Sequence, residues 1–188
     1  IARRVAYVPQ NPVAPGDMSV LDFVLIGRTP YIPYLGSETA DDLRAAHGVI
    51  RRLDLTDLAD RPVGSLSGGE FQRAVLGRAL AQGASILLLD EPTTALDVGR
   101  QAEVMELVQR LRSTRGLTVV SAMHDLTLAA QFADHLLLLR EGRIVARGSA
   151  SEVITEELVL THYGARVRVL DHPEGGVVVA PSRPKGER

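Results

Sequence analysis

The sequence predicts an α/β fold with a mostly parallel core sheet, and three features predict it. Two apolar runs, Ile86–Leu89 and Leu117–Met123, are typical of strands that are buried on both faces of a parallel sheet. The segment Asp97–Arg112 between them is amphipathic, which predicts a helix. The first run ends in Asp90 and Glu91, and α/β proteins place their ligands at this carboxyl edge of the sheet.

Composition is that of an ordinary globular domain. The chain has 188 residues, of which 45% are hydrophobic and 23% charged, so we expect one domain over residues 1–188. The net charge of −2 gives no support for a nucleic-acid partner. Because there is no cysteine, disulfides and thiolate metal sites are excluded. No apolar run approaches the ~18 residues that span a bilayer, so we expect any membrane association to depend on a partner.

Patterns in the N-terminal part predict a strand and two helices. Val5–Val8 is rich in β-forming residues. Ser19–Ile26 is a short apolar helix that begins at a serine N-cap and is expected to stop at Gly27. Asp41–Leu53 carries its apolar residues at helical spacing along one face.

A third helix provides the first candidate binding group. Ser67 and Glu70 have the spacing of a capping box, and apolar residues then recur at helical spacing as far as Ala79. Gly68 and Gly69 expose backbone N–H groups at the positive end of the helix dipole, and the serine adds a hydroxyl, so this helix start suits a phosphate. A capping box alone, however, usually does no more than begin a helix.

Polar residues at strand ends provide the candidate catalytic groups. Asp90 is placed to hold a hydrated magnesium ion, and Glu91 is placed to polarise a water molecule. Gln10 follows the first strand, and its amide oxygen suits the same metal shell. An acidic pair or a lone glutamine at a strand end is often only exposed. The conjunction of the acidic pair with the glycine-started helix is much more specific.

The C-terminal part predicts a helix and two hairpins. His124 directly follows the run Leu117–Met123, and Leu126–Phe132 is expected to be helical. A histidine at a strand end is often only an edge residue. The other expectations are a hairpin of residues 135–140 and 143–146, a capping box at Ser149 and Glu152, a hairpin at about 166–180 and a disordered tail over 181–188.

Three segments resemble motifs of ABC-type ATPases. Leu66–Glu70 resembles the signature motif, Ile86–Pro92 the Walker B motif with its catalytic glutamate, and Thr93–Asp97 the D-loop. The resemblance covers nearly the whole chain. It implies a P-loop NTPase fold of the ABC ATPase type, with a helical subdomain at about residues 17–78.

The resemblance also implies a role for each strand-end residue. Glu91 would be the general base, and His124 would be the switch histidine that contacts the γ-phosphate of ATP. Asp90 would be the carboxylate on the magnesium side. Gln10 would open the Q-loop and contact both magnesium and the attacking water.

A second subunit follows from the same resemblance, because two domains of this family enclose two ATP molecules head to tail. The signature residues Ser67, Gly68 and Gly69 would contact the γ-phosphate of the ATP held by the facing subunit. Asp97, at the end of the D-loop, is assigned to the ATP site.

The loop of residues 28–36 resembles the Q-loop region of importer ATPases for iron-siderophores, haem or cobalamin. Its residues Arg28, Tyr31 and Tyr34 would face the transmembrane permease, although a self-packed loop is the alternative. The family then implies an ATPase at the cytoplasmic face of the membrane, attached through the permease, with an extracytoplasmic substrate-binding protein as an indirect partner. The cargo cannot be read from this chain.

The sequence contains no G-x-x-x-x-G-K-[ST] string, and its only lysine, Lys185, lies in the polar tail. We expect a fragment whose upstream part carries the P-loop; a natural protein without this motif is the alternative. In either case the chain alone is predicted to be inactive. Two other functions remain open, namely a non-transport ABC ATPase and a non-catalytic interaction protein with the same fold.

Overall fold

The computed structural model describes residues 1–94, 96–173 and 175–182, apart from the side chain of Arg115. The chain divides into two compact units, Ile1–Ala122 and Met123–Arg188. The assignment of residues 1–188 to one domain stays a prediction.

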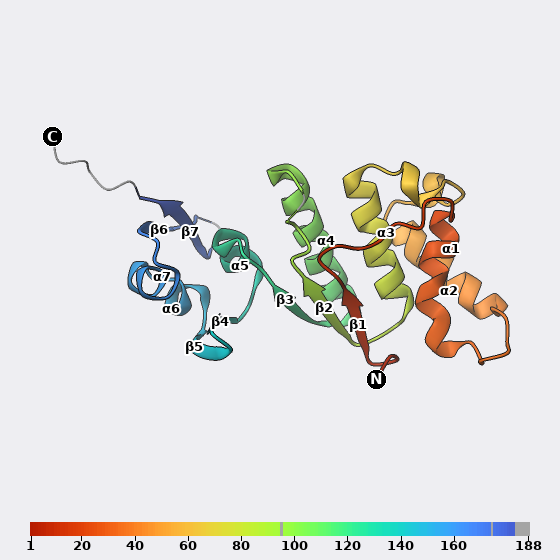
Figure 1. Cartoon of the computed structure of the whole chain (residues 1–188), viewed down its shortest axis with the longest axis horizontal. Coiled ribbons are helices and arrows are strands. Elements are labelled where there is room, and N and C mark those ends of the chain that lie inside the picture. Colours follow the sequence, from red (N-terminus) through yellow and green to blue (C-terminus); the bar gives the residue numbers. More distant parts are fainter. Residues whose placement is uncertain (95, 174, 183–188) are drawn as a thin grey trace. The chain divides into compact units, whose positions relative to one another are not determined.

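A three-stranded parallel sheet forms the centre of the first unit (Figure 1). Its strands are β1 (Val5–Val8), β2 (Ile86–Asp90) and β3 (Thr118–Ala122), in the order β1-β2-β3. Parallel pairing aligns Val8 with Leu89, and it aligns Asp90 with Ala122. The predicted parallel core sheet is therefore confirmed.

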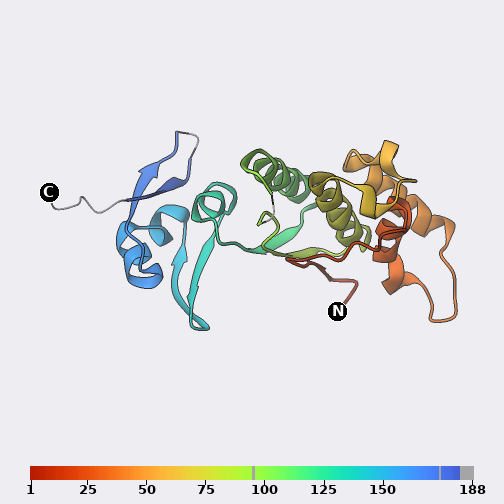
Figure 2. The ribbon, with the colours of Figure 1, turned by 45° about the horizontal axis from the view of Figure 1, so that its top comes forward.

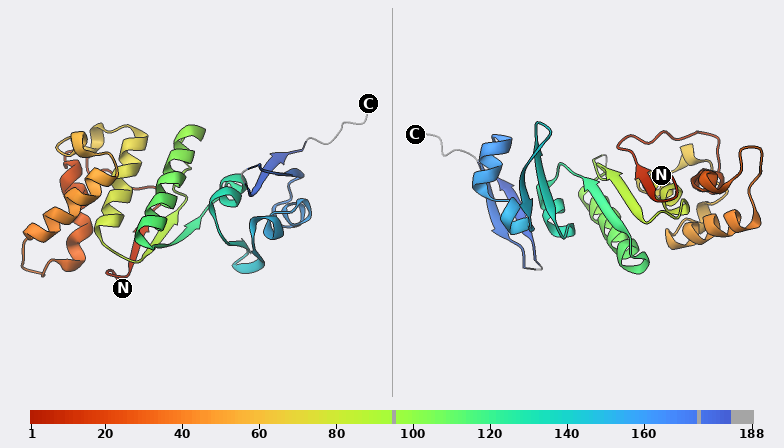
Figure 3. Two further views of the ribbon diagram at one scale, coloured as in Figure 1. Left: turned by 180° about the vertical axis from the view of Figure 1, so that it is seen from behind. Right: turned by 90° about the horizontal axis from the view of Figure 1, so that it is seen from below.

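Two helices pack on the same face of this sheet, as both Figure 2 and Figure 3 show. They are α3 (Gly68–Ala81) and α4 (Val98–Arg115). Alternate strand residues face them, because Ala6, Val8, Leu87 and Leu89 are at most 3% exposed. The sequence predicted burial on both faces for β2 and β3, but the other residues of β2 are only half-buried, and those of β3 alternate between exposed and half-buried.

The rest of the first unit is a helical region that packs against α3. Its elements are α1 (Val20–Leu25), the 3₁₀ helix η1 (Ile26–Tyr31), α2 (Ala40–Arg52) and the short 3₁₀ turns η2 (Thr56–Leu58) and η3 (Val63–Ser65). Ser19 caps α1, and Thr39 forms a capping box with Asp42 at the start of α2. These elements and α3 contain the predicted helical subdomain, whose boundaries remain a prediction.

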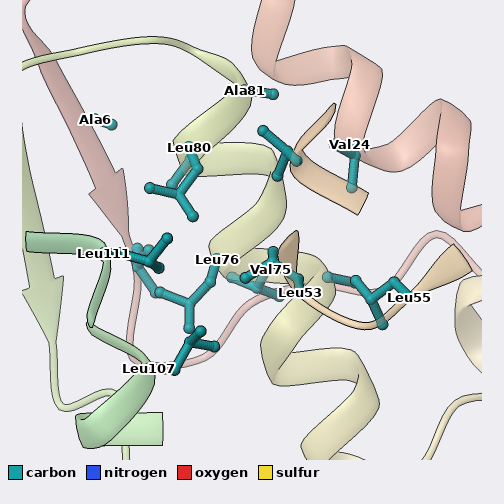
Figure 4. Close-up of a cluster of buried hydrophobic side chains, with 14 of the residues drawn as sticks. Ala6, Val24, Leu53, Leu55, Val75, Leu76, Leu80, Ala81, Leu107 and Leu111 are labelled. Atoms are coloured by element: carbon teal, nitrogen blue, oxygen red, sulfur yellow. The ribbon is translucent and has the colours of Figure 1, made fainter. Parts of the chain in front are cut away.

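One hydrophobic core joins the helical region to the sheet (Figure 4). Leu76 of α3 lies at its middle and is fully buried, with Leu53 and Leu107 among the other members of the cluster. Gly77 makes the close approach of α3 possible, since a Cβ there would lie 3.1 Å from both Leu53 and Val24. The signature helix is therefore packed on several sides.

The sequence predicted that the helix would end at Gly27, but the chain remains helical beyond this residue. The α-helical part of α1 gives way to η1 at Ile26, and the helical path continues to Tyr31. Gly27 is buried, and the carbonyl oxygen of Arg78 in α3 lies so close that it leaves no room for a Cβ at this position. Its glycine serves close packing between two helices and not termination.

The second unit contains three helices and two antiparallel hairpins among its described residues. The helices are α5 (Leu126–Phe132), α6 (Ala150–Val153) and α7 (Glu156–Tyr163), and the strands are β4 (Leu136–Arg140), β5 (Arg143–Gly148), β6 (Val167–Asp171) and β7 (Val177–Pro181). Ala130, Ile154, Val159 and Val177 form its own small core. Helix α7, capped by Thr155, was not predicted from the sequence.

The predicted disordered tail began at Pro181, but this residue is the last of β7. Residues 183–188 lie outside the described part of the chain. Among the helices that the structure describes, none combines the length and apolar character that crossing a membrane requires.

We predict that Leu76→Ala lowers the free energy of unfolding by about 2–5 kcal/mol, because it removes a fully buried side chain from a packed core. Leu35→Ala is the matched control, since Leu35 is 95% exposed, and it should change stability by less than about 0.5 kcal/mol. Urea unfolding followed by circular dichroism measures both, and equal losses would contradict the described core.

Candidate functional site

The candidate site lies where the parallel strands of the first unit end. Because β1 and β2 run in the same direction and in register, Gln10 and the pair Asp90 and Glu91 lie at the same edge of the sheet. Asp90 is the last residue of β2 and is half-buried, as is Glu91. The structure thus brings three of the predicted residues together.

Glu91 is held by its backbone and by two hydrogen-bond donors. Its φ of 47° lies in the left-handed region, which is uncommon for a residue with a side chain and is frequent at functional sites. Its N–H donates to the carbonyl of Ala122 at 3.0 Å. The amide nitrogen of Gln10 donates to Glu91 Oε2 at 2.5 Å, and the hydroxyl of Thr94 donates to the same oxygen at 2.8 Å.

Two donors on one carboxylate oxygen fix the direction of the whole group. A general base must meet its water at one position, so a fixed direction is what such a base requires. Thr94 was not among the residues predicted for the site. The one sequence feature that could have identified it is its spacing. Thr94 lies three residues after Glu91, so a turn can bring its hydroxyl back to the carboxylate.

Asp90 has a partner that the sequence analysis also missed. The hydroxyl of Tyr7 donates to Asp90 Oδ2 at 2.9 Å. Strand alternation explains the contact, because Tyr7 and Asp90 both point to the face of the sheet away from α3 and α4. This hydrogen bond raises the pKa of Tyr7, and partial burial and the charge of Asp90 raise it further.

The residues at this edge suit a magnesium ion by their chemistry. Gln10 uses its amide nitrogen on Glu91, so its amide oxygen is the atom available for a hard cation, and the Asp90 carboxylate at the same edge of the sheet offers further oxygens. Within the described residues, no group of three or more histidine, aspartate and glutamate side chains is arranged to hold a metal by itself. A magnesium ion would therefore need oxygen ligands from a nucleotide or from water, as it commonly does.

The signature motif begins α3 as the sequence predicted. The Ser67 hydroxyl accepts from the Glu70 N–H at 3.4 Å, and Glu70 Oε2 accepts from the Ser67 N–H at 2.7 Å. The hydrogen bond that the Glu70 carboxylate accepts from the Ser67 N–H, followed by one from the Ser67 side chain, lowers the pKa of Glu70. A hydrogen bond of 2.9 Å from Gln72 to the carbonyl of Pro92 ties α3 to the segment that follows Glu91.

The two signature glycines have different surroundings. Gly68 is exposed, and nothing lies within 4 Å of where its Cβ would be. Gly69 is buried, because the guanidinium of Arg100 occupies the space that a Cβ would need. Asp97 caps α4 by accepting from the Arg100 N–H at 3.0 Å, and it also pairs with the Arg100 side chain at 3.3 Å. Asp97 thus has a structural role here, and its contact with ATP stays a prediction.

The other predicted site residues lie on other parts of the chain. His124 belongs to the second unit, so its proximity to Glu91 stays a prediction. Arg28 lies inside the helical region, where its side chain is 15% exposed and paired with Asp42. Tyr31 is half-buried beside Arg28, whereas Tyr34 is fully exposed.

Comparison with known proteins gives consistent matches. The model of the family described as "ABC transporter" matches residues 1–94. The ferric enterobactin transport ATP-binding protein FepC of Escherichia coli is 41% identical over 94% of this chain and 65% of its own length. The hemin import ATP-binding protein HmuV of Rhodococcus jostii is 41% identical over 97% of this chain and 62% of its own. The chain thus spans less than two thirds of either relative.

A solved structure resembles the fold as a whole. It is a transporter described as being of the metal-chelate ABC type, in an inward-facing conformation, and it is 31% identical with a TM-score of 0.88. The match covers 96% of this chain and 73% of the solved one.

We predict that Asp90→Asn lowers the pKa of Tyr7 toward the ordinary tyrosine value of about 10, because it replaces the carboxylate that accepts the Tyr7 hydrogen bond with a weaker neutral acceptor and removes its charge. The stability from this contact is complete below the ordinary pKa and is lost as pH rises through the raised one. Tyrosinate absorbance measures the titration, and Tyr7→Phe identifies the step that belongs to Tyr7. An unchanged step in Asp90→Asn would contradict the contact.

Proposed function

We propose that this chain, which belongs to the ABC transporter family, is part of the ATP-binding subunit of an importer. The complete subunit would hydrolyse ATP to drive an iron-siderophore, haem or cobalamin-type cargo through a membrane permease. The relatives that transport ferric enterobactin and hemin support this class of cargo. The observation that carries the proposal is the convergence of Gln10 and Thr94 on Glu91, directly beside Asp90.

The reaction we propose is the attack of a water molecule on the γ-phosphate of ATP. Glu91 orients and deprotonates the water, and Gln10 keeps the carboxylate in place while its own amide oxygen turns to the metal. Asp90 and Gln10 would hold Mg²⁺, which neutralises charge on the phosphates when it is bound. His124 would donate a hydrogen bond to the γ-phosphate.

The partners follow from the position of the signature motif. Ser67 and Gly68 are exposed at the start of α3, where they can approach a nucleotide that is bound by another chain. We therefore propose a head-to-tail pair with a second ABC ATPase subunit. The pair would be attached to the permease at the cytoplasmic face of the membrane, with an extracytoplasmic substrate-binding protein as an indirect partner.

We predict no measurable ATP hydrolysis by this chain alone, because its sequence contains no P-loop to hold the nucleotide phosphates. Phosphate release is measured with malachite green, and Glu91→Gln is the control because it removes the proposed base. A rate above that control would overturn the prediction.

The signature motif can be tested by complementation. The chain is mixed with a siderophore-importer ATPase that has an intact P-loop but carries arginine in place of its own signature serine. We expect this chain to restore phosphate release, because its Ser67 and Gly68 complete the site on the other subunit. Ser67→Arg should leave the rate at least about tenfold lower, since a donor to the phosphate is lost.

Ser149→Arg is the matched control for this experiment, because Ser149 also begins a helix with a capping box but lies in the second unit. It should complement as well as the unchanged chain. Equal rates with Ser67→Arg and with the unchanged chain would refute the proposed role of the signature motif.

A further inference from the structure

Arg28 makes three contacts inside the first unit. Its Nε donates to Asp42 Oδ1 at 2.9 Å, and its Nη1 donates to the carbonyl of Ala81 at 2.9 Å. Its guanidinium also stacks on the ring of Tyr31, with Cζ 3.8 Å from the ring centroid. Asp42 lies at the start of α2, Ala81 ends the signature helix α3, and Tyr31 ends η1. One side chain therefore joins three elements.

The chemistry of these contacts requires arginine. A planar guanidinium donates in two fixed directions and stacks on an aromatic ring at the same time, whereas a lysine ammonium does not. The pair with Asp42 is largely removed from water, with side chains 15% and 5% exposed. Hydrogen bonds from Thr39, followed by that from Arg28, lower the pKa of Asp42 to about 2. The pair is therefore charged at neutral pH.

Tyr31 is fixed on its other side as well. The guanidinium of Arg3 lies 4.8 Å from the Tyr31 ring centroid, and Arg3 Nε donates to the carbonyl of Pro30 at 3.1 Å. The Tyr31 hydroxyl lies 3.4 Å from where a Cβ of Gly83 would be, at the turn between α3 and β2. Together with Gly27 against Arg78, these contacts seat η1 directly on the C-terminal end of α3.

The chain emerges from this seat as an exposed tip. Tyr34 is fully exposed and Leu35 is 95% exposed, only three and four residues beyond Tyr31. Pro30 and Pro33 restrict the backbone on the way, and the Gly36 N–H donates to the carbonyl of Pro33. The tip is thus short and is connected to its seat by a stiff segment.

We infer that Arg28 is a positioning residue that joins the exposed Tyr34–Leu35 tip to the C-terminal end of the signature helix. The tip and this helix end therefore undergo local opening together. The predicted contact of Arg28 with the permease stays a prediction beside this assignment. It deepens the proposed function and rests on it, because that function makes the tip a contact for a membrane partner. Helix α3 is 14 residues long, or roughly 21 Å, and a movement at Ala81 is carried to Ser67 by a rigid rod.

Hydrogen–deuterium exchange of the whole chain tests the inference through Arg28→Lys. Lysine keeps the charge opposite Asp42 but loses the bond to Ala81 or the stacking on Tyr31. We expect amide exchange to become about tenfold faster in two segments together, η1 with the tip and residues 78–83, while α4 keeps its rate. Arg44→Lys is the matched control, because Arg44 pairs with Asp41 on the same helix at an exposed position; it should change neither segment.

Asp42→Asn provides a second variant, which keeps an acceptor for Arg28 and removes the charge. It should accelerate the same two segments by a smaller factor. Acceleration of the tip alone, equal acceleration throughout the first unit, or no change would each overturn the inference. The measurement needs neither nucleotide nor permease. Its failure would therefore leave the proposed ATPase role untouched, and failure of the complementation experiment would leave the Arg28 result standing.

Discussion

The in-register parallel pairing of β1 with β2 is the constraint on which the first unit depends. It aligns Val8 with Leu89, so the polar residues that follow each strand reach the same edge together. The same register decides the faces of the sheet, because Ala6 and Leu87 turn toward the helices while Tyr7 and Asp90 turn away. A slip by one residue would expose the core residues and separate Tyr7 from Asp90. The register of the β1–β2 pair thus determines both which residues are buried and how the site residues are placed.

The signature helix is fastened to this sheet at both ends. Near its start, Gln72 donates to the carbonyl of Pro92, directly after the candidate base. At its end, Gln82 donates to the carbonyl of Val5 at 2.6 Å, and Arg28 donates to that of Ala81. Leu76 fills the core between these points. In each bond a side chain donates to a backbone carbonyl, so main-chain atoms of the helix or of its neighbours help to locate the helix in addition to hydrophobic packing.

Most of this arrangement could be predicted from local sequence. Capping boxes and apolar runs identified the signature helix and the strand that ends in Asp90, because both signals lie within a few consecutive residues. Contacts between distant residues could not be predicted in this way. Tyr7 and Asp90 are 83 residues apart, and Arg28 and Ala81 are 53 apart. Arg28 was assigned to the permease interface through the resemblance to importer ATPases, and nothing in the local sequence indicated Asp42, 14 residues away, with which Arg28 forms a largely buried ion pair.

The electrostatics of the signature helix start show why its glycines alone do not make an anion site. Glu70 is ionised and already accepts the backbone N–H of Ser67, so a negative charge stands where a phosphate would approach. The charges of Arg61 and Arg73 act on the same carboxylate and offset part of that repulsion. A phosphate that approaches through the open space beside Gly68 would have to compete with Glu70 for the Ser67 side chain, which hydrogen-bonds to that carboxylate. Under the proposed function, a nucleotide at this helix start would meet the negative charge of Glu70 and the positive charges of Arg61 and Arg73, so its attraction would depend on the two arginines as much as on the motif itself.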